Sequence, residues 1–171
     1  LRLLSPAKIN LMLHITGRRD DGYHELQTVF QLIGLYDDLT FSSTGDGRIS
    51  REASNFAVPP EQDLTIKAAQ LLQQQYRVRT GVKININKQI PMGGGLGGGS
   101  SDAATTLMAL NKIWRLELSS GQLRKIALKL GADVPFFIFG RNAWAEGIGE
   151  RLTAIDLATH WYLIVHPNIF V

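Results

Sequence analysis

The sequence predicts a soluble, globular α+β domain, and three observations support this fold class. Residues 7–15 and 82–87 alternate between apolar and polar side chains, which is typical of half-buried strands. Residues 64–76 and 119–130 carry apolar side chains at helical spacing instead. The 171 residues are 44% hydrophobic and 19% charged, which is enough apolar material for one real core.

The composition limits the kinds of chemistry that the chain can perform. The chain has no cysteine, which excludes disulfides, thiolate catalysis and cysteine-bound zinc and fits a cytoplasmic protein. No apolar run approaches the roughly 18 residues of a membrane span, and no secretory signal is recognisable. The net charge of +3 suits an anionic ligand. Because no block of basic residues is present, we expect neither a nucleic-acid partner nor a membrane.

Strands dominate the beginning and the end of the predicted domain. The odd-numbered residues of 7–15 form an apolar face, whereas the even-numbered ones include Lys8 and Asn10. A polar loop with an Asp-Gly turn signal follows, and 43–62 is predicted to be irregular. Further strands are predicted at 26–33, 39–42, 82–87, 134–139, 143–147 and 161–166.

Three helices are predicted from their caps and their apolar spacing. Asp63 is a suitable N-cap for a helix over 64–76. A second helix is predicted over 100–114. Ser119 and Gln122 form a capping-box pattern for the third helix, and Gly131 suits its C-terminal end.

The most unusual segment lies between the predicted strand at 82–87 and the helix at 100–114. Six of the seven residues from Gly93 to Gly99 are glycine, and each interior glycine costs roughly 0.5–1 kcal/mol relative to alanine. Amide groups in the first turn of a helix lack intrahelical partners, and the helix dipole places positive charge there. A glycine loop that leads into a helix therefore predicts a phosphate-binding site rather than a flexible tether.

Two common phosphate loops do not explain the segment. A Walker A motif requires a lysine directly after the glycines, and none is present. Gly93, Gly95 and Gly98 satisfy GxGxxG, but six glycines make that match uninformative. A dinucleotide fold would next have a strand that ends in an acidic residue about twenty positions on, whereas a second helix is predicted to follow the first one here.

The segment PMGGGLGGGSSDAA at 91–104 resembles the ATP-binding signature of the GHMP kinase superfamily. Residues 5–30 and 130–137 resemble the branch of this superfamily that phosphorylates 4-diphosphocytidyl-2-C-methyl-D-erythritol (CDP-ME) in the non-mevalonate route to isoprenoids. The resemblance covers the chain apart from the variable stretch near 43–62. It implies a GHMP kinase N-terminal domain, similar to domain 2 of ribosomal protein S5, that uses ATP and Mg²⁺ to phosphorylate the 2-hydroxyl of CDP-ME.

The resemblance also implies two catalytic residues. Asp133, in the GADVP segment, matches the aspartate that accepts the proton of the substrate hydroxyl. Lys8 matches a lysine that would keep Asp133 ionised and stabilise charge on the transferring phosphate. From the residues alone, Asp133 would equally suit a turn or a helix cap, and Lys8 a solvated strand lysine.

The remaining site residues follow from the same resemblance. Asn10, Tyr23 and His24 match substrate-binding positions, where a ring stacks on the cytosine and an imidazole or amide binds its edge. Without the resemblance, Tyr23 would be a packing residue and His24 a surface histidine. No metal ligand is assigned, although Ser100 and Ser101 could contact phosphate or Mg²⁺, or simply cap the helix. The implied nucleotide-binding residues are Asp63, Lys88, Pro91, Met92, Gly93, Gly94, Gly95, Leu96, Gly97, Gly98, Gly99, Ser100 and Ser101.

The sequence departs from the family pattern in two respects. Asp63 stands where some members carry an asparagine near the adenosine, and a carboxylate accepts hydrogen bonds but cannot donate them. In addition, the C-terminal domain is essentially absent. We expect one domain over 1–157, with 158–171 as the first strand of the missing domain. Such a fragment could be inactive, and its exposed strand would be open to pairing with another copy.

Two alternative functions remain open at this point. The first is a GHMP kinase for another small molecule, such as mevalonate or homoserine, although the DGYH segment at 21–24 argues against it. The second is a non-catalytic nucleotide- or RNA-binding module, which the S5-like fold and the basic pI of about 9.3 would permit. The sequence has no basic stripe or aromatic RNA-binding signature in support of this second reading. A dinucleotide-dependent oxidoreductase is a more distant third.

Overall fold

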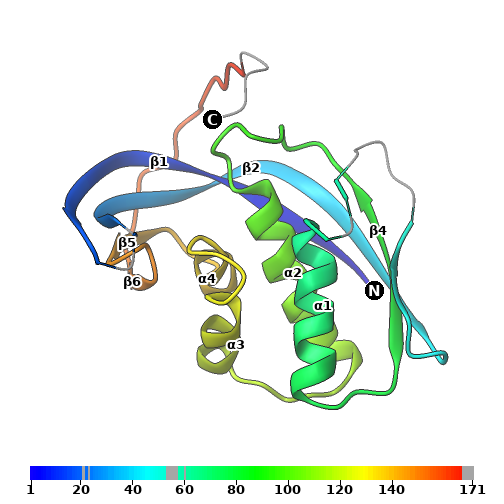
Figure 1. The fold of residues 1–171 in the computed structure, drawn as a ribbon. Coiled ribbons are helices and arrows are strands. Elements are labelled where there is room, and N and C mark those ends of the chain that lie inside the picture. The colour runs from blue at the N-terminus through cyan, green and yellow to red at the C-terminus, as the bar shows by residue number, and fades with distance from the viewer. Residues whose placement is uncertain (21, 23, 53–57, 60, 167–171) are drawn as a thin grey trace.

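The computed structural model describes residues 1–166 apart from 21, 23, 53–57 and 60. Four helices lie on one face of a six-stranded sheet (Figure 1). The strands follow the spatial order β3-β4-β2-β5-β6, and β1 pairs with β2 along its whole length. Only the β3–β4 pair is parallel. The strands are β1 (Arg2–Arg18), β2 (His24–Thr44), β3 (Ile49–Arg51), β4 (Gly81–Asn87), β5 (Ala143–Glu146) and β6 (Arg151–Ala154).

The helices are α1 (Leu64–Gln75), α2 (Gly98–Ile113), α3 (Ser120–Ala127) and α4 (Val134–Phe139). The three helices predicted from caps and spacing are confirmed, with ends that differ by a few residues. Asp63 caps α1 by accepting a hydrogen bond from the Thr65 amide, and Ser119 and Gln122 form the predicted capping box of α3. The core lies between these helices and the sheet, around Leu39, Ile84 and Leu107. Among the described residues, no helix is long and apolar enough to cross a membrane.

Strand β2 joins two segments that the sequence separates. We predicted strands at 26–33 and 39–42, but the structure has one strand from His24 to Thr44. Pro6 of β1 pairs with Tyr36, whereas the next residue, Ala7, pairs with Ile33. Two extra residues of β2 are therefore accommodated as an irregularity in the ladder, which bends the strand without ending it. The short strands β3 and β6 were not predicted.

The segment VPFFIF forms a helix and not a strand, so the prediction for 134–139 is wrong. Pro135 lies in the first turn of α4, where a missing amide hydrogen does no harm, and Gly140 ends the helix with a φ of 69°. Residues 134–138 are all buried. A helix that is covered on every side shows no apolar period, so a short apolar run does not distinguish it from a strand.

The strand predicted over 161–166 is also absent. Residues 155–166 form no regular secondary structure, and Trp161 is fully exposed. The segment leaves the sheet on the face opposite the helices (Figure 1). It contacts the sheet locally, because the Tyr162 hydroxyl donates a 2.7 Å hydrogen bond to Gln31 Oε1. An apolar segment needs a neighbouring strand to satisfy its backbone, and no described strand pairs with this one.

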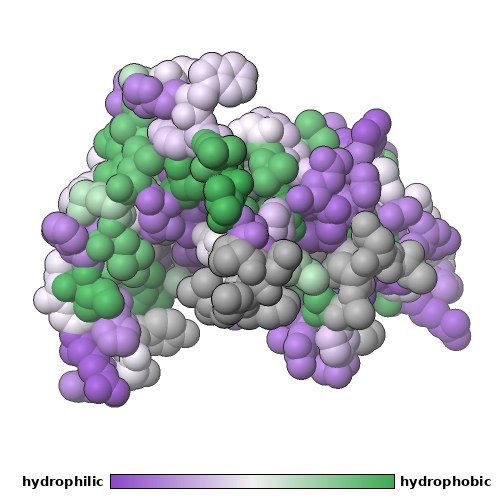
Figure 2. All heavy atoms as spheres, turned by 90° about the horizontal axis from the view of Figure 1, so that it is seen from above, coloured by the Kyte–Doolittle hydropathy of each residue, from purple (hydrophilic) through white to green (hydrophobic). Residues whose placement is uncertain are grey.

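Strand β1 is covered on both faces at one end and partly uncovered at the other. Ala7 and Lys8 point to opposite faces and are 0% and 5% exposed, so this part of the strand is not half-buried as predicted. Leu11, Leu13 and Ile15 are 44%, 50% and 62% exposed, although the sequence predicts them on the apolar face. The pairing slips by one residue between Asn10 and Met12, so Leu13 and Ile15 share a face with Thr28 and not with Ala7. Figure 2 shows the molecule from the side opposite the helices, and apolar side chains gather over one half of this view.

Candidate active site

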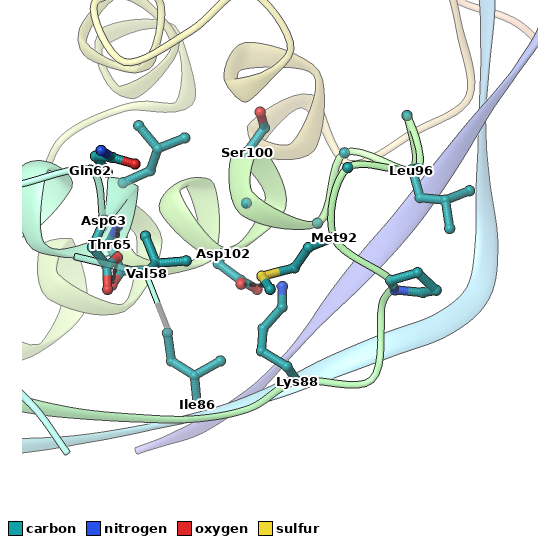
Figure 3. Close-up of a pocket in the computed structure, with 18 residues that line it drawn as sticks. Val58, Gln62, Asp63, Thr65, Ile86, Lys88, Met92, Leu96, Ser100 and Asp102 are labelled. Carbon is teal, nitrogen blue, oxygen red and sulfur yellow. Dashed lines mark hydrogen bonds and ion pairs between the residues drawn. The ribbon is translucent and has the colours of Figure 1, made fainter. Parts of the chain in front are cut away.

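The glycine loop leads directly into α2 and leaves the start of this helix open. Gly93, Gly95 and Gly97 have positive φ angles between 69° and 72°, which L side chains adopt only under strain. Gly97 is the N-cap of α2 and has no side chain with which to cap it. The amides of the first turn therefore have neither an intrahelical nor a side-chain partner within the helix. They border a cavity of about 330 Å³ (Figure 3).

The loop is attached to β1 through Leu96. Its side chain is 6% exposed and packs with Ala7 and Ile90 in a small apolar cluster. The Leu96 carbonyl also accepts a 2.9 Å hydrogen bond from the Lys8 amide. The backbone of Lys8 is consequently fixed beside the glycine loop, although about ninety residues separate them in sequence.

Gly97 is the point at which the loop meets Lys8 and helix α4. A Cβ atom at this position would lie 2.8 Å from the Phe137 ring and 3.2 Å from Lys8 Cε. Phe137 belongs to α4, whose N-cap is Asp133. Only glycine combines this close approach with the observed φ of 72°.

Lys8 and Asp133 lie together, as the sequence predicted. Lys8 Nζ is 3.3 Å from Asp133 Oδ2, and the lysine side chain is 7% exposed while that of the aspartate is 34% exposed. Asp133 makes no capping hydrogen bond to α4, so its carboxylate is turned to Lys8 instead of the helix end. A buried ammonium next to a partly exposed carboxylate leaves that carboxylate accessible to a substrate hydroxyl.

A chain of hydrogen bonds continues from Lys8 into the sheet. Lys8 Nζ donates to Asn10 Oδ1 over 2.6 Å, and Asn10 Nδ2 donates to Thr28 Oγ1 over 2.8 Å. The Thr28 hydroxyl in turn donates to the Met12 carbonyl. The ammonium also lies 5.1 Å from the centre of the Phe30 ring, a favourable cation–π distance. These contacts fix the ammonium of Lys8 at the end of the glycine loop.

On the other side of the loop, Lys88 forms a buried ion cluster. Its ammonium pairs with Asp37. It also pairs with Asp102 Oδ2 at 2.8 Å, and Figure 3 shows these two side chains beside the cavity. Burial lowers the pKa of Lys88, but the two carboxylates more than offset this effect and leave that pKa above its usual value. Burial raises the pKa of Asp102 to about 7; Lys88 opposes this shift and Asp37 adds to it.

Asp63 lines the cavity, but its carboxylate is already occupied. Oδ1 accepts hydrogen bonds from the Thr65 amide and hydroxyl, at 2.8 and 2.6 Å. Oδ2 pairs with Arg51 Nε at 2.8 Å. The geometry therefore favours the reading of Asp63 as the helix cap, with an ion pair to β3.

The other predicted residues are distributed unevenly around the site. Ser100 lines the cavity, whereas Ser101 is fully buried and its hydroxyl accepts a hydrogen bond from Ser5. His24 is exposed at the start of β2, six positions or about 20 Å along the strand from Phe30, the partner of Asn10. The structure therefore does not bring His24 to Lys8 and Asp133. Tyr23 lies outside the described residues.

Four residues around the site were missed by sequence reasoning. They are Thr28, Arg51, Asp37 and Asp102. Asp37 and Asp38 form an acidic pair between the apolar residues of 32–36 and Leu39, and this was a signal that we did not use. Asp102 follows the glycine loop directly, but nothing in its spacing indicates that it faces Lys88. Thr28 and Arg51 gave no recognisable signal.

Comparison with known proteins finds a matching family model and several similar proteins. Residues 63–141 match the family model of the GHMP kinases N-terminal domain. Over 168 residues the chain is 58% identical to a protein of Burkholderia thailandensis named 4-diphosphocytidyl-2-C-methyl-D-erythritol kinase, and 56% identical to its namesake from Burkholderia ambifaria. Each match covers 98% of this chain but 57% of the relative. The chain thus spans little more than half the length of these relatives.

Two solved structures also match most of the chain. A crystal structure of 4-(cytidine 5'-diphospho)-2C-methyl-D-erythritol kinase matches 92% of the chain with a TM-score of 0.80 and 42% identity, and 56% of that chain is covered. The structure of Methanococcus jannaschii mevalonate kinase matches 91% of this chain with a TM-score of 0.65 and 16% identity. The match covers 56% of the mevalonate kinase chain. The second likeness concerns the fold alone.

Proposed function

Because the chain has the sequence signature and the fold of a GHMP kinase N-terminal domain, we propose that it is the ATP-binding and catalytic part of a kinase acting on CDP-ME. The observation that carries this proposal is the meeting at Gly97 of an open helix N-terminus with the Lys8–Asp133 pair. The names of relatives 56–58% identical over 98% of the chain support the substrate. In this proposal the domain extends to about residue 157.

The cavity beside the loop would hold the nucleotide. The amides at the start of α2 and the partial positive charge of the helix suit the phosphates. Apolar side chains, including Val58, Leu64 and Ile86, line the remainder of the cavity and suit a purine base. Lys88 would contribute positive charge near the first turn of α2, where its Nζ lies 3.1 Å from the place of a Cβ at Gly98.

Mg²⁺ would enter together with ATP. Among the described residues, no cluster of three or more histidine or acidic side chains could hold a metal ion on its own. Mg²⁺ in such sites takes much of its coordination from phosphate oxygens and water. The Ser100 hydroxyl lines the cavity and would offer one additional oxygen.

Asp133 and Lys8 would carry out the transfer. The 2-hydroxyl oxygen of CDP-ME forms a bond to the γ-phosphorus while the bond from that phosphorus to the bridging oxygen of ADP breaks. Asp133 accepts the hydroxyl proton, and Lys8 stabilises charge on the acceptor oxygen. Asn10, hydrogen-bonded to Lys8 over 2.6 Å, would fix this ammonium and border the acceptor site. Roles for Tyr23 and His24 in cytidine binding stay predictions.

The test is phosphoryl transfer from ATP to CDP-ME, followed by ³¹P NMR. The assay uses this chain beside a version extended to the length of its relatives. Formation of the 2-phosphate by the extended version alone supports the assignment and makes this chain an incomplete enzyme. If both versions form the 2-phosphate, the essential groups lie within these 171 residues. If neither version phosphorylates CDP-ME, the proposed substrate is wrong.

A further inference from the structure

We propose that Asp37 is a positioning residue for the glycine loop. Its buried carboxylate fixes the backbone at the entrance of the loop and holds the Lys88 ammonium below the first turn of α2. The proposal rests on the proposed function, in which this loop binds ATP. Asp37 lies in β2, more than fifty residues before the loop, and belongs to none of the segments that carry the family signature.

Asp37 binds three successive residues with one carboxylate. Oδ1 accepts hydrogen bonds from the amides of Gln89 and Ile90, at 2.6 and 2.9 Å. Oδ2 accepts a hydrogen bond from Lys88 Nζ. The side chain of Asp37 is completely buried. Hydrogen bonds to an ionised acceptor are about twice as strong as neutral ones, so this carboxylate restrains residues 88–90 firmly.

Two side chains transmit this restraint to the first turn of α2, where the proposed phosphate site lies. A Cβ at Gly98, in the first turn of α2, would lie 3.0 Å from Ile90 Cγ2 and 3.1 Å from Lys88 Nζ. Both contacts come from residues that Asp37 holds. The loop itself contains six glycines and therefore has little intrinsic order. Fixing its entrance reduces the conformational freedom that it must lose when a nucleotide binds.

The neighbouring residue Asp38 provides a matched control. Successive side chains of a strand point to opposite faces, so Asp38 points away from the loop. Its carboxylate accepts hydrogen bonds from Arg2 Nε at 2.9 and 3.0 Å, and the Arg2 side chain is 71% exposed. Asp37→Asn and Asp38→Asn thus make the same chemical change at neighbouring positions. Only the side chain at position 37 contacts the residues that lead into the glycine loop.

The experiment compares Asp37→Asn, Asp37→Ala and Asp38→Asn in the version extended to the relatives' length. An asparagine at 37 can still accept the two amide hydrogen bonds, but its NH₂ group opposes Lys88; alanine removes all three contacts. We expect ATP affinity, measured by calorimetry, to fall about tenfold in Asp37→Asn and further in Asp37→Ala. The KM for CDP-ME should stay unchanged in both, and Asp38→Asn should match the wild type.

Hydrogen exchange of the nucleotide-free protein separates positioning from general destabilisation. We expect faster amide exchange over residues 89–99 in the Asp37 variants, with unchanged rates in β5 and α3. Uniformly faster exchange, or a rise in the KM for CDP-ME as large as the loss of ATP affinity, would assign Asp37 a merely structural role. Wild-type ATP affinity in Asp37→Ala overturns the proposal. If the wild type itself binds no ATP, the proposed function fails, and the exchange rates alone decide whether Asp37 orders the loop.

Discussion

At the scale of single residues, the site depends on side chains whose surroundings select one role among several. Asp133 occupies the N-cap position of α4, but its carboxylate makes no capping hydrogen bond and lies 3.3 Å from the Lys8 ammonium. Asp63 shows the reverse outcome, because the cap and the Arg51 ion pair use both of its oxygens. The sequence allowed a cap or a functional role for each of these two aspartates, and the structure shows that their carboxylates have different partners.

The role of Asp133 leads to a first prediction. In the extended protein, Asp133→Asn should lower kcat by about 10²–10⁴, because the amide cannot accept the hydroxyl proton. ATP affinity should be unaffected, since Asp133 does not line the nucleotide cavity. Steady-state kinetics and calorimetry check the two halves separately. Unchanged turnover would remove Asp133 from the mechanism.

Gly97 leads to a second prediction. Gly97→Ala should lower the free energy of unfolding by about 1–3 kcal/mol through its positive φ alone. The new Cβ would also meet Phe137 and Lys8, which adds steric strain and displaces Lys8. Gly95→Ala is the control, because Gly95 has a similar φ of 69° but no atom within 4 Å of its Cβ position. Urea unfolding that gives equal losses for both variants would contradict the proposed steric contact.

At the scale of elements, buried charges connect parts of the fold that are distant in sequence. Asp37 of β2, Lys88 after β4 and Asp102 of α2 meet below the glycine loop. The ion pair between Arg51 and Asp63 joins β3 to the N-terminus of α1 in the same way. These contacts hold two walls of the proposed nucleotide cavity to the sheet, so the shape of the cavity and the stability of the fold depend on the same residues.

The ion cluster leads to a prediction about pH. Burial raises the pKa of Asp102 to about 7, above its usual value of 3.8, so the folded state binds a proton more tightly than the unfolded state. The stabilisation associated with this proton is complete below pH 4 and is lost as the pH rises through about 7. Relative to Asp102→Asn, the wild type should therefore lose stability between about pH 4 and pH 7.

Urea unfolding at several pH values checks this difference. The asparagine variant has no proton to lose at this position, so it removes the contribution of Asp102 while other titrating groups cancel in the comparison. A pH-independent stability difference between the two proteins would show that Asp102 is ionised throughout this range.

At the scale of the whole molecule, the helices cover the centre of the sheet and leave one end of β1 partly exposed. Leu11, Leu13 and Ile15 form an exposed apolar row on β1, and Leu163 and Val165 are exposed in the C-terminal segment. The chain spans 57% of the length of its named relatives. Apolar surface of this kind favours association, because its burial removes it from water.

We therefore predict that this chain self-associates at high concentration. Leu13→Ser with Ile15→Ser should reduce association if the β1 row mediates it, whereas Leu163→Ser with Val165→Ser should reduce it if the C-terminal segment does. Light scattering coupled to size-exclusion chromatography distinguishes the two pairs. A monomer at every concentration would contradict the prediction.

The sequence by itself determined the fold class, the helix caps and the position of the glycine loop before α2, because these depend on local patterns. Helical spacing, the cap at Asp63, the capping box at Ser119 and the glycine run each act over a few neighbouring residues. The resemblance to GHMP kinases placed Lys8 and Asp133 in one site, and the structure brings them to 3.3 Å.

Only the tertiary structure decided the features that depend on distant partners. VPFFIF became a helix because its surroundings bury it on every side, and 161–166 formed no strand because no described strand pairs with it. Asp37 acquired its contacts with residues 88–90 only when β2 and β4 paired in one register. A carboxylate gives no local sign of which distant amides it will accept, since that choice is made by packing and not by sequence spacing.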